Sequence, residues 1–243
     1  MLPNLAEEYT HWAQGNDKPL FGTHPDARVL HALVDLGIQE SRLRVLDVGA
    51  GDGRNAIPLA KRGCAVDTLE LTPALAERLR RVAAAQNADI QVFVGDLFDR
   101  SLALNPEGYH LVILSGVASH FRSTAQLRQW LERLCNLLVG GGQCVMNIFL
   151  TDPGYRPDEL VRQLSQAAWS SVFTPEELRE AMAGLPLHCL SDDPVWEYER
   201  QHLPPAAWPP SPWFETWTQG RGVLPTREER PPFQMHWIAL SKT

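Results

Sequence analysis

Three glycines at alternate positions separate an apolar run from a helix-like run in the stretch RVLDVGAGDGRNAIPLA, residues 44–60. Gly49, Gly51 and Gly53 leave the backbone without side chains where a predicted strand ends and a predicted helix begins. In this arrangement backbone N–H groups and a helix N-terminus can approach a ligand at the carboxyl edge of a sheet. The loop therefore indicates a site where a ligand lies directly against the main chain.

The glycine spacing does not match the two common phosphate-binding loops. A dinucleotide loop, GxGxxG, would need a third glycine at position 54, where the chain has Arg54. A triphosphate loop would end in GK followed by Ser or Thr, and residues 44–60 contain no such ending. An NAD(P)-dependent oxidoreductase remains an alternative, because it would share the strand, the loop and a carboxylate for the ribose.

Three carboxylates lie at the ends of three successive apolar runs. Asp47 precedes the loop, Glu70 closes the run 65–70, and Asp96 follows the run 90–95. Asp47 could pair with a cationic amino group, and Asp96 could meet an adenine amino group. Glu70 follows the loop by about 20 residues, the spacing of a carboxylate that binds ribose hydroxyls. Together they indicate a nucleoside ligand that carries a positively charged amino group.

An alternation of strand-like and helix-like runs positions these residues. Five runs are predicted as strands, at 43–48, 65–70, 90–95, 109–115 and 143–149. Thr72 with Pro73, and Ser123, indicate two helix starts, and the glycines at 140–142 are expected to end the second helix and turn the chain. Alternation of this kind predicts an α/β fold with a doubly wound parallel sheet.

The segments outside this core are expected to complete a single domain that spans residues 1–243. Residues 25–37 have the pattern of an amphipathic helix, and residues 1–24 are interpreted as a flexible or lid-like arm before it. After the sheet the pattern predicts two helices and then two strands, at 157–169, 174–183, 187–199 and 234–241.

Residues 203–232 form a compositionally unusual insert between the last two predicted strands. They contain eight prolines and the tryptophans Trp208, Trp213 and Trp217. The prolines predict a stiff, non-helical segment, which could act as an aromatic lid over an apolar, soft or cationic acceptor. Packing across the sheet edge and a subunit contact are the alternatives.

The composition favours a globular protein without an obligatory nucleic-acid or membrane partner. The 243 residues are 44% hydrophobic, and a formal net charge of −7 without a long Lys/Arg block argues against nucleic acid. No run approaches the roughly 18 apolar residues of a membrane span, and the N-terminus lacks a signal-peptide pattern, so a cytoplasmic location is expected. The four cysteines show no CxxC spacing, so no metal site is expected.

The order of these motifs resembles the class I S-adenosylmethionine-dependent methyltransferases. The resemblance covers about residues 25–150 and rests on VLDVGAGDGRN, Glu70, GDL, YHLVILSGVASHF and LLVGGGQCVMNIF. The details GDGRNAIPLAKRG, THPDA and FTPEEL are similar, more narrowly, to the tellurite-resistance type of methyltransferase. The chain departs from that type at Glu70, where the type has Asp, and in the insert 203–232.

The resemblance implies a Rossmann-like, mostly parallel sheet of seven strands, with the last strand antiparallel beside the fifth. It implies S-adenosylmethionine as the methyl donor and S-adenosylhomocysteine as the product. The methionine part would contact Asp47, Gly49 and Gly51, the ribose would contact Glu70, and the adenine would contact Asp96 and Leu97. Further cofactor contacts are expected from Ala50, Arg54, Asn55, Leu71 and Ser115.

The methyl acceptor is expected beyond the fourth predicted strand, where the chain reads SGVASHF. His120 could act as a general base or position the acceptor, because the unperturbed pKa of histidine lies near neutrality; packing beneath the next helix is the alternative. We expect a small-molecule acceptor, methylated on oxygen, nitrogen, sulfur or a metalloid; a regulatory protein that only binds the cofactor is a second alternative. The expected acceptor contacts are Tyr9, Trp12, His24, Ser119, Phe121 and Trp213.

Overall fold

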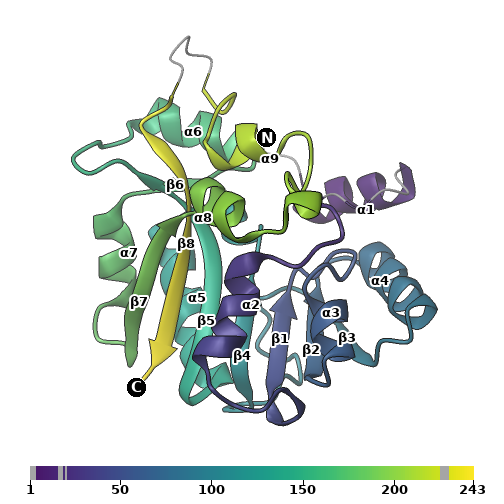
Figure 1. Cartoon of the computed structure of the whole chain (residues 1–243). Helices are drawn as coiled ribbons and strands as arrows, with labels where there is room; N and C mark the ends of the chain where they lie inside the picture. The colour runs from purple at the N-terminus through teal and green to yellow at the C-terminus, as the bar shows by residue number, and fades with distance from the viewer. Residues whose placement is uncertain (1–3, 16–18, 20, 225–229) are drawn as a thin grey trace.

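The computed structural model describes residues 4–15, 19, 21–224 and 230–243. Its centre is a sheet in the order β3-β2-β1-β4-β5-β8-β7, with the short strand β6 paired to β5 (Figure 1). The strands are β1 (Arg44–Val48), β2 (Ala65–Glu70), β3 (Ile90–Val94), β4 (Tyr109–Leu114), β5 (Leu138–Thr151), β6 (Val172–Phe173), β7 (Leu187–Pro194) and β8 (Phe233–Lys242).

The strand directions agree with the expected fold class. Strands β3, β2, β1, β4 and β5 are parallel neighbours, whereas β8 lies antiparallel between β5 and β7. The predicted path of seven strands, with the last strand beside the fifth, is therefore confirmed. The two-residue strand β6 adds an eighth strand that the sequence did not indicate.

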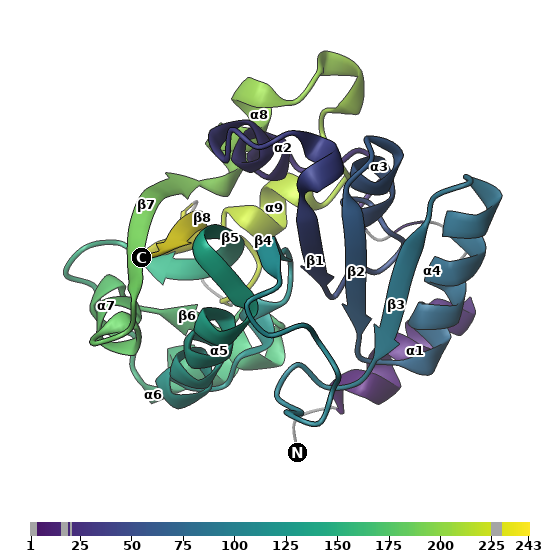
Figure 2. The ribbon, with the colours of Figure 1, turned by 90° about the horizontal axis from the view of Figure 1, so that it is seen from below.

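Helices cover both faces of the sheet (Figure 2). Side chains of α2 (Ala27–Asp35), α3 (Ala56–Lys61), α4 (Pro73–Ala85), α8 (Val195–His202) and α9 (Phe214–Thr218) join one buried cluster, which includes Val45 of β1. Those of α5 (Thr124–Leu137) and α7 (Pro175–Met182) join the other, which includes Leu46. Successive strand residues face opposite sides, so β1 contributes to both layers. The two remaining helices are α1 (Leu5–Gly15), which packs on α4, and α6 (Glu159–Ala167), which packs on β6.

The main helices begin where the sequence indicated. The Thr72 and Ser123 side chains accept hydrogen bonds from the N–H groups of Leu75 and Gln126, each at 3.2 Å. Thr174 and Glu177 form a reciprocal capping box at the start of α7. These caps satisfy N–H groups that have no partner within the helix.

The C-terminal part differs from the sequence prediction. The strand predicted at 187–199 ends at Pro194 and continues as helix α8, because Val195 and Glu199, one helical turn apart, are both buried. The insert 203–232 was predicted to be non-helical, but it contains a 3₁₀ turn (Pro205–Ala207) and α9. Five of its eight prolines precede residue 213 and none lies between 213 and 224, so the turn that follows can be helical. Residues 225–229 of the insert lie outside the described residues.

Two other predictions need adjustment. The glycines at 140–142 lie inside β5, which begins at Leu138, instead of forming a turn before it. The described part of the N-terminal arm is mostly the helix α1, while residues 1–3, 16–18 and 20 of that arm lie outside the described residues. None of the helices in the described ranges is long and apolar enough to cross a membrane.

A fully buried carboxylate joins α8 to the start of α2. Glu199 is 0% exposed and accepts hydrogen bonds from the N–H groups of Ala27 (2.8 Å) and Arg28 (3.2 Å) and from Nε1 of Trp237 (2.9 Å). The first N–H groups of a helix lack partners within the helix, and a negative charge is favourable there. Glu199 therefore fixes the loop before α2, which carries Asp26.

We expect Glu199→Ala to lower the free energy of unfolding by about 3 kcal/mol, because three buried N–H donors lose their acceptor. Urea denaturation followed by circular dichroism measures this change. Glu197→Ala alters an exposed residue of the same helix and should change the free energy by less than about 0.5 kcal/mol. Equal losses in the two variants would show that this contact does not anchor α2.

Candidate active site

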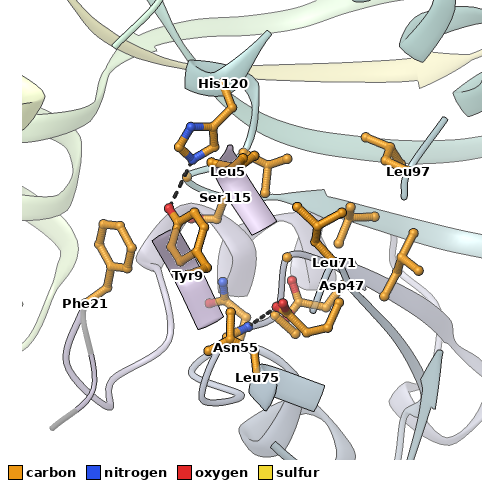
Figure 3. A pocket seen from close by; sticks show the side chains of 18 of the residues that line it. Leu5, Tyr9, Phe21, Asp47, Asn55, Leu71, Leu75, Leu97, Ser115 and His120 are labelled. Atoms are coloured by element: carbon orange, nitrogen blue, oxygen red, sulfur yellow. Dashed lines mark hydrogen bonds between the residues drawn. The ribbon is translucent and has the colours of Figure 1, made fainter. Parts of the chain in front are cut away.

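A cavity of about 400 Å³ lies at the carboxyl ends of β1, β2 and β4 (Figure 3). Its volume falls within the roughly 300–1,000 Å³ of small-molecule sites. Its wall includes the loop 49–51 and the three carboxylates Asp47, Glu70 and Asp96, together with Tyr9 of α1 and His120. The fold thus brings the glycine loop and the predicted carboxylates to one cavity.

The three loop glycines meet different surroundings. All have positive φ, +68° at Gly49, +56° at Gly51 and +81° at Gly53, a conformation that favours glycine. A Cβ atom on Gly49 would overlap the side chain of Val117, and one on Gly53 would overlap side chains of α3 and α4. A Cβ atom on Gly51 would meet no atom within 4 Å. Packing within the protein therefore requires Gly49 and Gly53, whereas at Gly51 the space that a side chain would occupy is open.

Asp47 is a buried carboxylate with an unsatisfied oxygen. It is 2% exposed, and its Oδ2 has no hydrogen-bond partner among the described residues. Burial raises the pKa of Asp47 to about 8; Arg54 acts in the opposite direction, and Asp26 and Glu70 add to the increase. A cationic group placed beside Oδ2 would offset the cost of this burial. The site therefore fits a ligand with an ammonium group.

Glu70 and Asp96 continue the acidic wall along β2 and β3. Burial raises the pKa of Glu70 to about 7, although its carboxylate accepts a hydrogen bond from the N–H of Gly51 at 2.5 Å. Asp96 accepts a hydrogen bond from the N–H of Phe98 at 2.7 Å, which fixes the turn after β3. Glu70 therefore shapes the glycine loop and still presents a carboxylate at the cavity wall. The apolar side chains Leu71 and Leu97 line the same region (Figure 3).

A second carboxylate network supports the loop from behind. Asp26 pairs with Arg54 and accepts hydrogen bonds from Nδ2 of Asn55 (3.0 Å) and Oγ of Ser115 (2.9 Å). The Oδ1 atom of Asn55 in turn accepts a hydrogen bond from the backbone N–H of Asp26 at 2.9 Å. Arg54, Asn55 and Ser115 line the cavity, and their charge and hydrogen-bonding groups are largely occupied by Asp26. Their contact with a cofactor stays a prediction.

Tyr9 and His120 form the opposite wall. The Tyr9 hydroxyl lies 3.1 Å from Nε2 of His120, and the two rings meet edge to face (Figure 3). Burial, and secondarily the charge of Arg122, lowers the pKa of His120 to about 4. Burial, and secondarily Glu70, raises the pKa of Tyr9 to about 12. Both side chains are therefore neutral at physiological pH.

Residues 45–142 match a family model described as a methyltransferase domain. The matched segment contains the glycine loop and all three carboxylates of the cavity wall. This match assigns residues 45–142 to a methyltransferase domain.

Two curated relatives overlap the methyltransferase domain in part. The chain is 43% identical over 63 residues to the probable ribosomal RNA small subunit methyltransferase A of Pyrobaculum aerophilum, a match that covers 26% of each protein. It is 34% identical over 104 residues to the ribosomal RNA small subunit methyltransferase J of Alcanivorax borkumensis, which covers 40% of this chain and 41% of that relative. The matches thus span less than half the length of either relative.

Solved structures resemble the chain over nearly its whole length. A geranyl diphosphate C-methyltransferase from Streptomyces coelicolor A3(2), in complex with Mg²⁺, geranyl-S-thiolodiphosphate and S-adenosyl-L-homocysteine, has a TM-score of 0.69 at 15% identity and covers 98% of each chain. A putative sarcosine dimethylglycine methyltransferase from Galdieria sulphuraria has a TM-score of 0.68 at 14% identity and covers 99% of each chain. These likenesses establish the fold in which the methyltransferase domain is embedded.

Three predicted acceptor residues lie away from the cavity wall of the methyltransferase domain. Ser119 is 0% exposed, because the 3₁₀ turn 118–120 directs it inward toward the carbonyl of Gly116. Trp213 lies behind Phe21, with ring centroids 4.9 Å apart, and His24 hydrogen-bonds to the carbonyl of the next residue. The predicted residues Tyr9, Trp12 and Phe121 do line the cavity.

Sequence reasoning missed several wall residues. Leu5 shares one face of α1 with Tyr9 and Trp12, and this helical spacing was a usable signal. Phe21, Phe98, Val117 and Arg122 come from turns whose direction the sequence does not specify. Gln126 lies in the first turn of α5.

The raised pKa of Asp47 predicts a pH-dependent affinity of the methyltransferase domain for S-adenosylhomocysteine. The ligand's ammonium group needs the ionised carboxylate, so affinity should rise by up to about tenfold per pH unit from pH 6 to pH 8, with release of protons. Asp47→Asn should weaken binding by about tenfold or more and reduce this slope. Calorimetric titrations in buffers of different ionisation enthalpy measure both quantities.

The same carboxylate should destabilise the ligand-free protein. Because the folded-state pKa of Asp47 is raised, its contribution to stability is full below about pH 4 and is lost as the pH rises toward 8. Asp47→Asn should therefore raise the unfolding temperature at pH 8, by about 2–4 °C for each kcal/mol by which the free energy of unfolding increases. Asp89→Asn, at an exposed position, is the control. If the unfolding temperature of Asp47→Asn depends on pH as steeply as that of the wild type, the Asp47 carboxylate does not destabilise the ligand-free protein.

Proposed function

We propose that the chain transfers the methyl group of S-adenosylmethionine to a small-molecule acceptor that enters beside Tyr9 and His120. One observation carries the proposal: the same cavity contains the glycine loop with its acidic wall and, opposite them, a largely apolar wall built by α1 and the turn after β4. Donor and acceptor can therefore meet in one cavity.

The acidic wall would hold the donor in a fixed direction. Asp47 and the backbone at Gly49 and Gly51 would receive the amino acid part, and Glu70 would accept hydrogen bonds from the ribose hydroxyls. Asp96, with the apolar Leu71 and Leu97 nearby, would receive the adenine. The unsatisfied Oδ2 of Asp47 supports placing the amino acid part of the donor here, because a cation stabilises a buried carboxylate oxygen that has no hydrogen-bond partner.

The chemistry needs positioning more than acid–base assistance. The bound donor supplies an activated sulfonium methyl group. Residues that align the acceptor with that methyl and exclude water can contribute up to about 7–11 kcal/mol. The rings of Phe21, Phe98 and Phe121 border the cavity and would exclude water from the acceptor end.

His120 would position the acceptor and would not remove a proton from it. A histidine with a pKa of about 4 is a poor base at neutral pH, since each unit of pKa mismatch costs about 1.4 kcal/mol. Its Nε2 already lies within hydrogen-bond distance of the Tyr9 hydroxyl. This differs from the sequence-based reasoning, which took the unperturbed pKa of histidine. The favoured acceptors are atoms that carry a free lone pair at neutral pH.

A small molecule is favoured over ribosomal RNA, which the names of the two partial relatives suggest. The cavity has room for a ligand of small-molecule size, and the exposed side of α1 carries Glu7 and Glu8. A formal net charge of −7 is unfavourable for a polyanion. An NAD(P)-dependent oxidoreductase would leave the unsatisfied Asp47 without a cationic partner.

Incubation with methyl-labelled S-adenosylmethionine tests the proposal. Parallel reactions contain a panel of small carboxylates, amines, thiols and metalloid oxyanions, or small-subunit ribosomal RNA. We expect label in at least one small-molecule product and none in RNA. Calorimetry should show binding of S-adenosylhomocysteine and no binding of NADH or NADPH. Labelled RNA alone, or binding of a nicotinamide cofactor alone, would contradict the proposal.

Tyr9→Phe tests the positioning role. Loss of the hydroxyl should lower kcat by about two- to tenfold, because His120 loses the hydrogen bond that orients it. The affinity for S-adenosylhomocysteine should stay within about twofold, since Tyr9 lies on the wall opposite Asp47. Tyr155→Phe alters a tyrosine outside the cavity and is the matched control. Equal kcat values for Tyr9→Phe and the wild type would exclude this role.

A further inference from the structure

The two ends of the cavity differ in charge. Asp47, Glu70 and Asp96 line the end of the cavity that would hold the donor. Arg122 lies at the other end, together with His120, and its positive charge contributes to the lowered pKa of His120. Arg54 also lines the cavity, but it is paired with Asp26. Within the described ranges, the Arg122 guanidinium has no carboxylate oxygen within 4 Å.

The surroundings of Arg122 are neutral. Its Nη1 donates to the carbonyl of Gln166 at 2.9 Å, and its guanidinium lies 5.5 Å from the ring centroid of Trp169. Burial lowers the pKa of the Arg122 guanidinium, as expected for a cation that is partly removed from water. An anion in the cavity would compensate this charge, and a planar guanidinium suits a carboxylate or a similar oxyanion.

Gln126 adds a second donor. Its Oε1 accepts a hydrogen bond from the backbone N–H of Arg122 at 2.6 Å, which fixes the orientation of the side-chain amide. The Nε2 group is thereby left as a donor on a residue of the cavity wall. Arg122 directly precedes the N-cap residue Ser123, Gln126 lies in the first turn of α5, and both line the cavity, so both can reach one ligand group.

We propose that Arg122 and Gln126 form an anion subsite that selects acceptors with a carboxylate, or a similar small oxyanion, on an apolar body. The apolar part fits the remaining wall at this end, formed by Leu5, Phe21, Phe98, Val117 and Phe121. This inference rests on the proposed function and specifies its substrate class. Such a substrate needs no general base, because a carboxylate is already ionised at neutral pH. This substrate class is therefore consistent with a His120 that stays neutral.

Binding of matched probes tests the subsite without requiring turnover. Hexanoate and 3-phenylpropionate are each compared with their neutral amides, by ligand-observed NMR at saturating S-adenosylhomocysteine. In the wild type we expect at least one acid to bind about tenfold more tightly than its amide. If no acid binds more tightly than its amide, the inference is wrong.

Two variants locate the preference. Arg122→Gln should remove it by weakening the acid about tenfold while leaving the amide within twofold. Gln126→Glu should do the same without disturbing the contacts of Arg122 with Gln166 and Trp169, because it replaces the Nε2 donor with a carboxylate that repels the acid. Arg179→Gln removes one positive charge from an exposed position of α7 and should keep the preference. An acid preference that persists in both cavity variants would overturn the assignment.

The titration of S-adenosylhomocysteine separates two kinds of failure. If the wild type does not bind it, the proposed function fails before the subsite is reached. If Arg122→Gln loses affinity for S-adenosylhomocysteine and keeps its preference for the acid probe, Arg122 serves the carboxylate of the donor, and the acceptor subsite is excluded.

Discussion

The site depends on a carboxylate that the fold buries without giving it a full set of partners. Asp47 sits at the end of β1, within a sheet covered on both faces, and only 2% of it is exposed. Such a group costs stability unless a cation or a proton compensates its charge. The protein retains this cost at the position where bare backbone opens to the cavity at Gly51. A bound cationic nucleoside would offset the free-energy cost of the buried Asp47 carboxylate, and this offset would contribute to the affinity for the ligand.

Distant parts of the chain hold this arrangement in place. Asp26, before α2, ties the loop after β1 to the end of β4 through Arg54, Asn55 and Ser115. Glu199 of α8 in turn fixes the backbone that follows Asp26. The insert acts through contacts as well, since Trp213 and Trp217 pack on Phe21, which borders the cavity. Its described residues therefore shape the wall from behind and do not cover the cavity as a lid.

The sequence predicts those features that depend on local periodicity and on chain order. The parallel strands and the meeting of Asp47, Glu70 and Asp96 at one edge follow from the alternation of strands and helices. The helix caps follow from the capping residues Thr72 and Ser123. The strand predicted through residue 199 was wrong because Val195 and Glu199 are buried by tertiary contacts that no local pattern reveals. Ser119 was expected at the wall, but a single 3₁₀ turn directs it inward. Asp26 gains its importance only from partners far away in the sequence, which are Arg54, Asn55 and Ser115.

A crystal structure of the wild-type protein with S-adenosylhomocysteine would show whether Asp47 binds the ligand's ammonium group. We expect the ammonium group beside Oδ2 of Asp47, the main chain of Gly51 against the ligand, the ribose hydroxyls on Glu70, and the adenine between Leu71 and Leu97. A ligand bound elsewhere on the chain, or one that leaves Oδ2 of Asp47 without a cationic partner, would contradict this expectation.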